Sequence, residues 1–237
     1  MNNSLGKIIL ITGASNGIGY ETALQLANEP GTTVIAVARN EKALQELSNK
    51  SQGPIIPLVF DLETADYKTI IEHPVIKKLS HLDILIHNAG KLVNKPFEDI
   101  TEEELKGCYS VNVLAPFLLT QALLPLLKKA DKAHIVHISS IGGIQGSVKF
   151  PGLSAYSTSK GALSILTECL AEEFSQTNIK VNCLALGAVK TEMLSRAFPG
   201  YEAPLTAAEM GNYVTRFALE GNTYFNGKII PVALSTP

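Results

Sequence analysis

The stretch IILITGASNGIG, residues 8–19, decides the fold of this chain. A β-branched apolar run, Ile8–Ile11, leads directly into a turn with three glycines, and a helical pattern follows at once. In such an arrangement Gly13 permits a tight turn, Gly17 lets the backbone approach a pyrophosphate, and Gly19 lets helix and strand pack closely. The phosphates would meet free N–H groups at the positive end of the helix dipole. The stretch therefore predicts a dinucleotide-binding βα unit.

The spacing of these glycines is G-x-x-x-G-x-G rather than the commoner G-x-G-x-x-G. Glycines also mark ordinary turns, so a plain βα turn is the alternative interpretation. The order of strand, glycines and helix near the N-terminus favours the cofactor site. Ser15, Asn16 and Ile18 lie within the same turn and are expected beside the cofactor.

The rest of the chain alternates short apolar runs with longer segments of helical spacing. The runs are apolar almost throughout, as in parallel strands that are buried on both faces. The expected strands are Ile8–Ile11, Thr33–Ala38, Ile55–Phe60, Ile84–His87, His134–Ile138, Lys180–Leu184 and Ile229–Val232. The expected helices include Gly17–Asn28, Asn40–Lys50 and segments that begin with capping boxes at Thr101 and Thr206. This pattern predicts an α/β fold: a doubly wound, Rossmann-like, mostly parallel seven-stranded sheet with helices on both faces.

Neither a repeat nor a Gly/Pro/Ser-rich linker divides the sequence. We therefore expect one Rossmann-type domain over residues 1–237, with dinucleotide binding mainly in 1–115 and the catalytic and substrate loops mainly in 138–205. Gly142–Gly152 and Leu194–Leu205 have the composition of functional loops, and ligands of such folds bind at the carboxyl ends of the strands.

The composition narrows the function. Hydrophobic residues make up 46% and charged residues 18% of the 237 residues, as in a globular protein, and the net charge of −2 leaves no basic excess for nucleic acid. The N-terminus lacks the plan of a signal peptide, and no stretch approaches the ~20 apolar residues of a membrane helix. We expect a cytoplasmic protein with no membrane partner. The three cysteines, Cys108, Cys169 and Cys183, are expected to be buried apolar side chains, and no metal site is expected.

The second expected strand ends in Ala38 and Arg39, where a fold that prefers NAD usually carries an acid. A carboxylate would repel a 2′-phosphate, whereas a guanidinium pairs with it. We therefore expect NADP(H), with NAD(H) less favoured and Arg39 and Ser15 near the phosphate. A solvated surface arginine is the alternative for Arg39. Asp61, which Leu62 follows, either accepts from the adenine amino group or caps the next helix.

Tyr156 and Lys160 are four residues apart in a segment with helical character, so they share one face. A nearby ammonium is expected to lower the pKa of a tyrosine, which could then exchange a proton with a carbonyl oxygen. Ser140, at the end of the fifth strand, could donate to the same oxygen. Tyr224 and Lys228 repeat the spacing across an Asn-Gly turn, and we interpret that pair as structural.

Several segments of the sequence resemble, in order, the motifs of the single-domain short-chain dehydrogenases/reductases. They are Thr12–Gly19, Asn88-Ala89-Gly90, Asn112, Ser140 and Tyr156…Lys160. The resemblance covers essentially the whole chain. It implies that Ser140, Tyr156 and Lys160 are catalytic, and that Asn112 holds a water which completes a proton relay. It makes Val189 and Thr191 partners of the nicotinamide. It also implies a homo-oligomer, a tetramer or dimer, built on the long helices around Asn112 and Leu163.

Three features depart from that family's pattern. Leu186 stands where the family usually has proline, the loop is lengthened through Gln145–Phe150, and the segment after Thr191 is short. We expect a freer backbone beside the nicotinamide, an unusual pocket wall and a reduced lid over the substrate.

The expected reaction is hydride transfer between NADPH and a carbonyl or secondary alcohol of a small molecule. A 3-oxoacyl thioester reductase and a non-catalytic NADP-binding sensor or scaffold are the alternatives. The expected pocket is mostly apolar, although half of these residues could instead be core: Leu92, Val93, Ile141, Phe150, Met193 and Phe198.

Overall fold

A computed structural model describes residues 6–234 and contains one large parallel sheet. Within the described residues its seven strands have the order β3-β2-β1-β4-β5-β6-β9. Their bounds are β1 (Lys7–Thr12), β2 (Thr32–Ala38), β3 (Ile55–Val59), β4 (Ile84–His87), β5 (Ala133–Ser140), β6 (Ile179–Leu186) and β9 (Ile229–Val232). The strand order reverses between β1 and β4, which is where doubly wound sheets bind ligands. The predicted fold class is confirmed.

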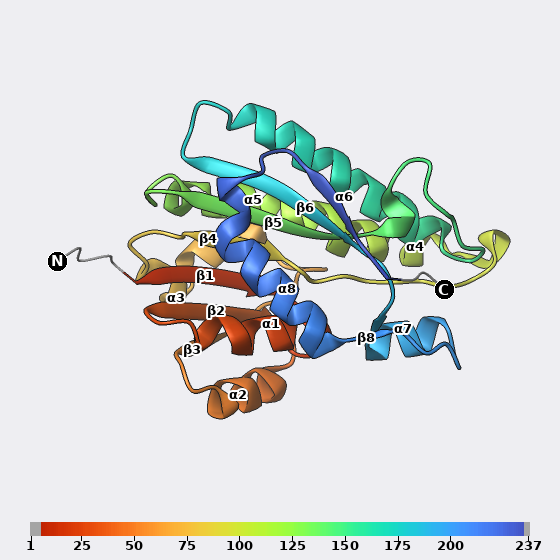
Figure 1. The fold of residues 1–237 in the computed structure, drawn as a ribbon, viewed down its shortest axis with the longest axis horizontal. Helices are drawn as coiled ribbons and strands as arrows, with labels where there is room; N and C mark the ends of the chain where they lie inside the picture. Colours follow the sequence, from red (N-terminus) through yellow and green to blue (C-terminus); the bar gives the residue numbers. More distant parts are fainter. Residues whose placement is uncertain (1–5, 235–237) are drawn as a thin grey trace.

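Helices cover both faces of this sheet (Figure 1). They are α1 (Gly17–Ala27), α2 (Glu41–Lys50), α3 (Pro74–Lys77), α4 (Glu102–Tyr109), α5 (Ala115–Leu127), α6 (Ser154–Glu173), α7 (Glu192–Ala197) and α8 (Ala207–Glu220). Helices α1, α2 and α8 pack on one face, and α3, α5 and α6 pack on the other. Two short strands, β7 (Val189–Lys190) and β8 (Leu205–Thr206), pair with each other beside α7.

The alternation of side chains along β1 divides the core into these two layers. Ile9 and Ile11 enter the cluster under α1 and α8, whereas Leu10 enters the cluster under α5, and all three are 0% exposed. A shift of one residue would exchange the two sets between the layers, so the apolar pattern fixes the register of the sheet.

Capping hydrogen bonds confirm three of the predicted helix starts. Thr101 and Thr206 each form the expected capping box, with Glu104 and Glu209 respectively. Asn40 caps α2 by accepting from the N–H of Ala43.

Both outer strands carry a proline. Pro57 lies in β3 and Pro231 in β9. On the inner side, the N–H of Phe60 donates to Ala38 O, and Val232 O accepts from the N–H of Gly187. The backbone groups of successive residues in a strand point to opposite sides. The nitrogens of both prolines therefore lie on the outer side, away from the neighbouring strand.

Two expectations from composition are wrong. The continuous helical stretch Glu102–Leu127 is long and apolar enough to cross a membrane by length and hydropathy, although no stretch of this kind was expected. Leu119, Leu123 and Leu127 within it are 0% exposed and pack against the sheet, so its composition also fits a core helix. Cys169 is exposed rather than buried, unlike the other two cysteines.

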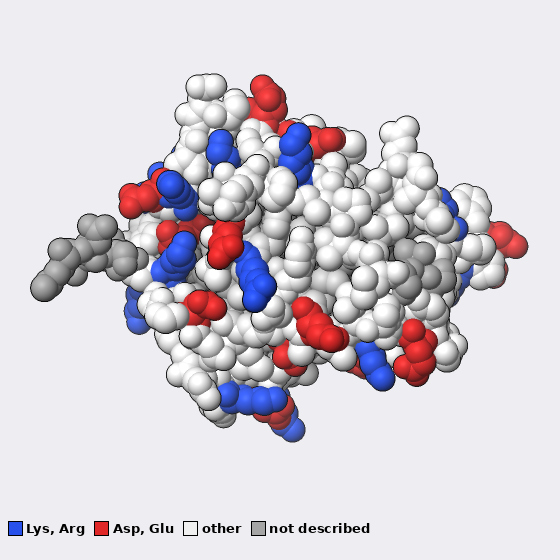
Figure 2. All heavy atoms as spheres, in the orientation of Figure 1, with Lys and Arg blue, Asp and Glu red and all other residues white. Residues whose placement is uncertain are grey.

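Charged side chains of both signs are interspersed over the face shown in Figure 2. In the described part of the chain, that face has no continuous basic surface of the kind that follows a phosphate backbone.

Three buried histidines lie in the middle of the sheet, and His87 and His137 are neighbours across β4 and β5. Their ring centroids are 5.2 Å apart. His87 Nε2 lies 2.9 Å from Thr120 Oγ1 on α5, and His137 Nδ1 lies 2.8 Å from Thr167 Oγ1 on α6. Burial lowers the pKa of His137 from 6.5 to about 3 and that of His134 to about 4. The pKa of His87 is likewise lowered, first by burial and then by His137.

The neutral state of His137 predicts a loss of stability in acid. Its pKa is 6.5 ordinarily and about 3 in the folded chain, so between these pH values the unfolded chain binds a proton that the folded chain does not. The free energy of unfolding therefore falls as the pH drops below about 6.5. We expect His137→Asn to flatten this dependence by about 1.4 kcal/mol per pH unit between roughly pH 4 and 6. Urea unfolding at a series of pH values measures it.

Asparagine suits this test because the polar atoms of its amide, Oδ1 and Nδ2, are bonded to Cγ, as Nδ1 is in histidine. The amide can therefore still form a hydrogen bond with Thr167. His73→Asn, at the half-buried N-cap of α3, is the matched control for replacing a histidine by asparagine outside the sheet. An unchanged slope in His137→Asn would contradict the assignment.

Candidate functional site

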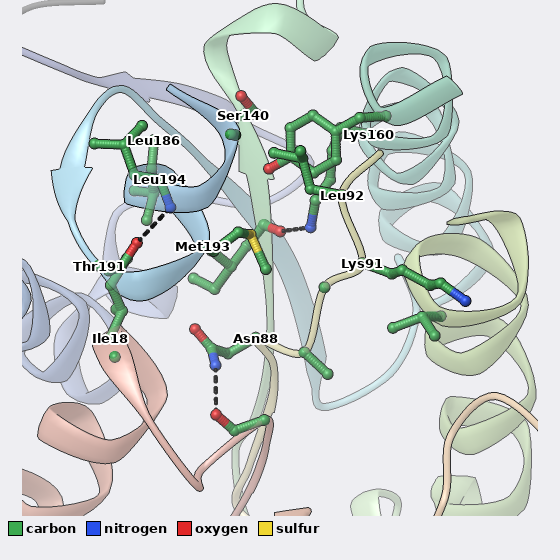
Figure 3. A pocket seen from close by; sticks show the side chains of 18 of the residues that line it. Ile18, Asn88, Lys91, Leu92, Ser140, Lys160, Leu186, Thr191, Met193 and Leu194 are labelled. Carbon is green, nitrogen blue, oxygen red and sulfur yellow. Dashed lines mark hydrogen bonds between the residues drawn. The ribbon is translucent and has the colours of Figure 1, made fainter. Parts of the chain in front are cut away.

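A cavity of about 670 Å³ opens at the carboxyl ends of the central strands. Its walls come from the turn after β1, the ends of β2 to β6, and the segment through α7. Figure 3 shows Ser140 and Lys160 at one side of this cavity, Leu186, Thr191 and Leu194 opposite them, and Asn88 and Ile18 at its base. Residues far apart in the sequence thus meet at the switch point of the sheet.

The turn from β1 to α1 has the form expected of a phosphate cradle. Gly13 and Gly17 have φ angles of 70° and 57°, a region that favours glycine. A Cβ on Gly19 would lie 2.4 Å from Gly13 O, so only glycine allows this helix to approach the strand. Asn16 precedes α1, and within the described residues its side chain makes no capping hydrogen bond. The first N–H groups of α1 are therefore available to an anionic ligand.

Asn88 fastens this turn to the end of β4. Its Nδ2 donates to Thr12 O at 3.0 Å and to Gly13 O at 3.2 Å. The N–H groups of Asn88 and Ala89 both donate to Thr12 Oγ1 at 3.1 Å. Asn88, Ala89 and Gly90 also line the cavity, as predicted from their small size and position. The amide of Asn88 thus holds the cradle in shape.

The far end of the cavity is charged. Arg39, at the end of β2, has a side chain 69% exposed and lies 3.9 Å from Glu63. Ser15 and Leu62 line the same end of the cavity. Asp61 accepts from the N–H of Glu63 at 2.9 Å and from Thr64 Oγ1 at 3.1 Å. Its carboxylate therefore closes a local turn and also lines the cavity. The interpretation of Asp61 as a helix cap is wrong, because the next helical segment, Tyr67–Glu72, is capped by Asp66. The contact with adenine stays a prediction.

The three expected catalytic side chains come from two elements. Ser140 ends β5, and Tyr156 and Lys160 share one face of α6. Lys160 is 3% exposed, and its Nζ donates to Ile138 O at 2.7 Å and lies 5.9 Å from the centre of the Tyr156 ring. Ser139 Oγ donates to Lys160 O at 2.9 Å. Hydrogen bonds from both sides thus hold α6 to β5.

Burial dominates the titration of these groups. It raises the pKa of Tyr156 to about 12, against the opposite effect of a hydrogen bond with Ser140. Burial also lowers the pKa of Lys160 to about 8. The expectation that the lysine lowers the tyrosine pKa is wrong, because desolvation of the buried phenolate prevails.

Asn112 lies in a π-helical turn, Ser110–Leu114, between α4 and α5. Its Oδ1 accepts from the N–H of Lys91 at 2.8 Å, and its Nδ2 donates to Lys91 O at 2.9 Å and to Ser159 Oγ at 2.8 Å. Ser159 Oγ in turn donates to Tyr156 O at 2.7 Å. The fully buried amide of Asn112 therefore links the chain after β4 to the backbone of Tyr156. Such π-helical turns occur frequently at functional sites.

On the opposite wall, Thr191 caps α7 by accepting from the N–H of Leu194 at 3.3 Å. Its Cγ2 lies 3.5 Å from the position of a Cβ on Gly17, so it closes over the glycine turn. Val189 is buried in β7 and also lines the cavity. Leu186 continues β6 to its end beside Ser140, so this backbone, which the missing proline was expected to free, is held in the sheet.

The part of the cavity beyond Tyr156 and Ser140 is apolar. The Phe150 and Phe198 rings meet edge to face with centroids 6.2 Å apart, which joins the long loop to the segment after α7. Asn94 Nδ2 donates to Ala197 O at 2.6 Å and ties α7 to the loop after β4. Five of the six predicted pocket residues line the cavity: Leu92, Ile141, Phe150, Met193 and Phe198. Val93 does not, because it packs with Cys108 and Ala155 in a small separate core.

Several wall residues were not predicted. Glu63, Lys91, Asn94 and Leu153 all line the cavity. Their sequence signal is only that they follow the ends of strands or precede α6. Tyr224 is 77% exposed and lies after a 3₁₀ turn, apart from the cavity. Within residues 6–234, His, Cys, Asp and Glu side chains form no group of three placed to hold a metal.

Comparisons with known proteins identify the family of this chain. The family model for short chain dehydrogenase matches residues 7–202. The chain is 30% identical over 240 residues to a 3-oxoacyl-[acyl-carrier-protein] reductase of Thermotoga maritima, with 96% of each chain covered. It is 32% identical over 203 residues to cyclopentanol dehydrogenase of Comamonas testosteroni, which covers 85% of this chain and 79% of that one.

A solved short chain dehydrogenase of Shigella flexneri, complexed with NADP, superposes with a TM-score of 0.85 at 31% identity. The superposition covers 98% of this chain and 99% of that one. Together with a family match that spans residues 7–202, these likenesses show that the chain belongs to the short-chain dehydrogenase/reductase family of oxidoreductases.

Proposed function

We propose that this chain is an NADP(H)-dependent oxidoreductase that interconverts a carbonyl group and a secondary alcohol. The observation that carries the proposal is the meeting of Ser140, Tyr156 and Lys160 in one cavity with the glycine turn. Bound NADPH supplies the hydride. The chain itself binds, orients and exchanges the proton.

The glycine turn fits a dinucleotide. Free N–H groups at the start of α1 suit the pyrophosphate, and the end of β2 offers Arg39, with no carboxylate at Ala38, to a 2′-phosphate. The Shigella flexneri relative is complexed with NADP. We assign the following residues to the cofactor: Gly13, Ser15, Asn16, Gly17, Ile18, Gly19, Arg39, Asp61, Leu62, Asn88, Ala89, Gly90, Tyr156, Lys160, Val189 and Thr191.

Tyr156 is the proposed general acid and base. Because burial raises its pKa to about 12, the phenol is protonated at neutral pH and can give its proton to a carbonyl oxygen during reduction. Ser140 donates a hydrogen bond to the same oxygen. Lys160 is proposed to hold the ribose hydroxyls of the cofactor. Asn112 positions these groups through Ser159 and, in the proposed relay, holds a water next to the lysine.

The substrate is proposed to be an apolar, uncharged ketone or alcohol. Its side of the cavity is lined by Leu92, Ile141, Phe150, Met193 and Phe198. Two cations that line the cavity outside the reacting groups are already paired, Lys91 with Glu63 and Arg196 with Glu192. A carboxylate or phosphate on the substrate would therefore meet apolar walls. The Comamonas testosteroni relative, by its name, acts on cyclopentanol, an alcohol of this class.

Replacing Tyr156 by phenylalanine tests the mechanism. We expect Tyr156→Phe to lower the rate of NADPH oxidation with a responsive ketone by about 10²–10⁴-fold, because the proton donor is lost, while NADPH still binds. Absorbance at 340 nm reports turnover and fluorescence titration reports binding. Tyr224→Phe, at the exposed repeat of the spacing, is the matched control and should keep full activity. Unchanged turnover in Tyr156→Phe would refute the assignment.

Replacing Phe198 by alanine tests the substrate wall. The loss of its ring contact with Phe150 enlarges the apolar end of the cavity. We expect kcat/KM to fall for small cyclic ketones and to rise about 10-fold for bulkier ones, the usual scale for a change of shape in an apolar pocket. Phe97→Ala, at a position 80% exposed and outside the cavity, should change neither. Equal losses for all ketone sizes would argue against a role in specificity.

The similarity to the Thermotoga maritima reductase supports a second candidate function, the reduction of 3-oxoacyl thioesters. Lys128 and Lys129, the basic pair that could bind a phosphorylated carrier, follow α5 and precede β5. They therefore lie at the amino ends of the strands, whereas the cavity lies at the carboxyl ends. A panel of ketones, aldehydes, keto sugars and 3-oxoacyl thioesters distinguishes the two activities, and NADPH binding without any turnover would favour a sensor or scaffold.

We further propose that residues 1–237 act as one Rossmann-type domain in the cytoplasm and assemble as a homodimer or homotetramer. Leu105 on α4, Leu114 and Phe117 around the start of α5, and Ile165 on α6 are exposed apolar side chains that pairing of these helices would cover. Light scattering coupled to gel filtration is expected to give two or four times the 25.4 kDa of the chain. A monomer at micromolar concentration would refute the assembly.

A further inference from the structure

Glu63 lies between two cations at the charged end of the cavity. Its Oε2 is 3.9 Å from Arg39 Nη1, and its Oε1 is 2.6 Å from Lys91 Nζ. All three residues line the cavity. The Lys91 side chain is 35% exposed, whereas the Arg39 side chain is 69% exposed. The closer and less exposed partner of Glu63 is therefore Lys91, which leaves Arg39 the more open to a ligand.

The position of Lys91 is fixed by its surroundings. Its backbone N–H and C=O both bond to the buried amide of Asn112. A Cβ on Gly107 of α4 would lie 2.3 Å from Lys91 Nζ and 2.9 Å from Glu63 Oε1, so the pair packs closely against this helix. In Figure 3, Lys91 extends away from Lys160 and Ser140, and therefore away from the reacting groups. Lys91 and Glu63 thus form a packed ion pair outside the chemistry.

An unpaired carboxylate here would oppose a phosphate in two ways. It would attract the Arg39 guanidinium and would repel the phosphate, and both effects act well within the ~8 Å screening length at physiological salt. Hydrogen bonds from the N–H of Glu63 and from Thr64 hold the Asp61 carboxylate in a local turn, so replacing Lys91 leaves this carboxylate in place. The strength with which Glu63 attracts Arg39 is therefore set by Lys91.

We propose that the Lys91–Glu63 ion pair determines the preference for NADPH over NADH. Lys91 neutralises Glu63, so Arg39 remains available to the 2′-phosphate. This inference rests on the proposed use of NADP(H). It assigns cofactor specificity to a residue on the loop after β4, remote from the end of β2 where specificity was expected from sequence.

A double-mutant cycle with Lys91→Met and Glu63→Gln tests the inference. Dissociation constants for NADPH and NADH are measured by fluorescence titration, without turnover. Lys91→Met should raise the constant for NADPH about 10-fold, a free-energy change of about 1.4 kcal/mol. NADH, which lacks the phosphate, should change by less than about 2-fold. Glu63→Gln should lower the constant for NADPH by about 3-fold, and the double variant should match Glu63→Gln within about 2-fold.

The electrostatic cause has its own readout, because the effect of Lys91→Met should shrink as salt rises toward 0.5 M, where screening is stronger. The exposed pair Lys106–Glu102 on α4, 2.6 Å apart, supplies the matched control, and Lys106→Met should leave both constants unchanged. Thermal unfolding of each variant reports its folding, and Glu63→Gln tests the idea even if Lys91→Met is unstable.

The outcomes separate this inference from the proposed function. If the unaltered chain binds NADPH no more tightly than NADH, the proposed cofactor is wrong. If it prefers NADPH but Lys91→Met weakens both cofactors equally, or Glu63→Gln fails to restore binding in the double variant, Lys91 merely supports the backbone at Asn112 and the inference is overturned.

Discussion

The close attachment of α6 to β5 is the constraint on which the site depends. Lys160 Nζ donates to a carbonyl of β5, and Ser139 of β5 donates to the carbonyl of Lys160, so each element holds the other. A Cβ on Gly143 would lie 2.7 Å from the Lys160 carbonyl carbon, which shows how little space separates the chain after β5 from the helix. These contacts between α6 and β5 fix the rotation of α6 about its axis, and hence the direction in which the Tyr156 side chain points. A helix set even slightly farther away would separate the phenol from Ser140.

The second support of the site is the buried amide of Asn112. It joins the backbone after β4 to Ser159, and through Ser159 to the carbonyl of Tyr156. The π-helical turn is what brings this amide inward, because an extra residue in the turn rotates the side chain relative to a regular helix. The chain after β4, which carries Lys91 of the charged end of the cavity, is therefore connected to the catalytic helix through one side chain.

Local pattern was enough to predict the seven strands of the large sheet, the capping boxes and the glycine turn, but not the short strands β7 and β8. The β-branched runs and capping boxes carry their information within a few residues, and Gly13, Gly17 and Gly19 are needed for reasons that spacing reveals. Tyr156 and Lys160 could be paired from the sequence because one helix holds both. The roles of these residues in turnover stay predictions, since geometry places them without measuring what they do.

Features that depend on distant contacts could not be predicted. The ion pair of Glu63 and Lys91 joins two loops, and nothing in either loop names the other. The raised pKa of Tyr156 comes from burial, whereas the sequence shows only the neighbouring lysine. Val93 and Cys169 have the same apolar character as core or pocket residues, and only the packing of the helices decided that one enters a separate core and the other faces outward.

The prolines of the two outer strands have a consequence for the molecule in a crowded solution. A sheet with free edges can recruit strands from other chains and grow into aggregates. Pro57 and Pro231 face outward from β3 and β9, so each edge lacks a donor in the middle of a short strand. An incoming strand would find the ladder interrupted at both ends of the sheet. The chain therefore carries its own protection against β-sheet polymerisation.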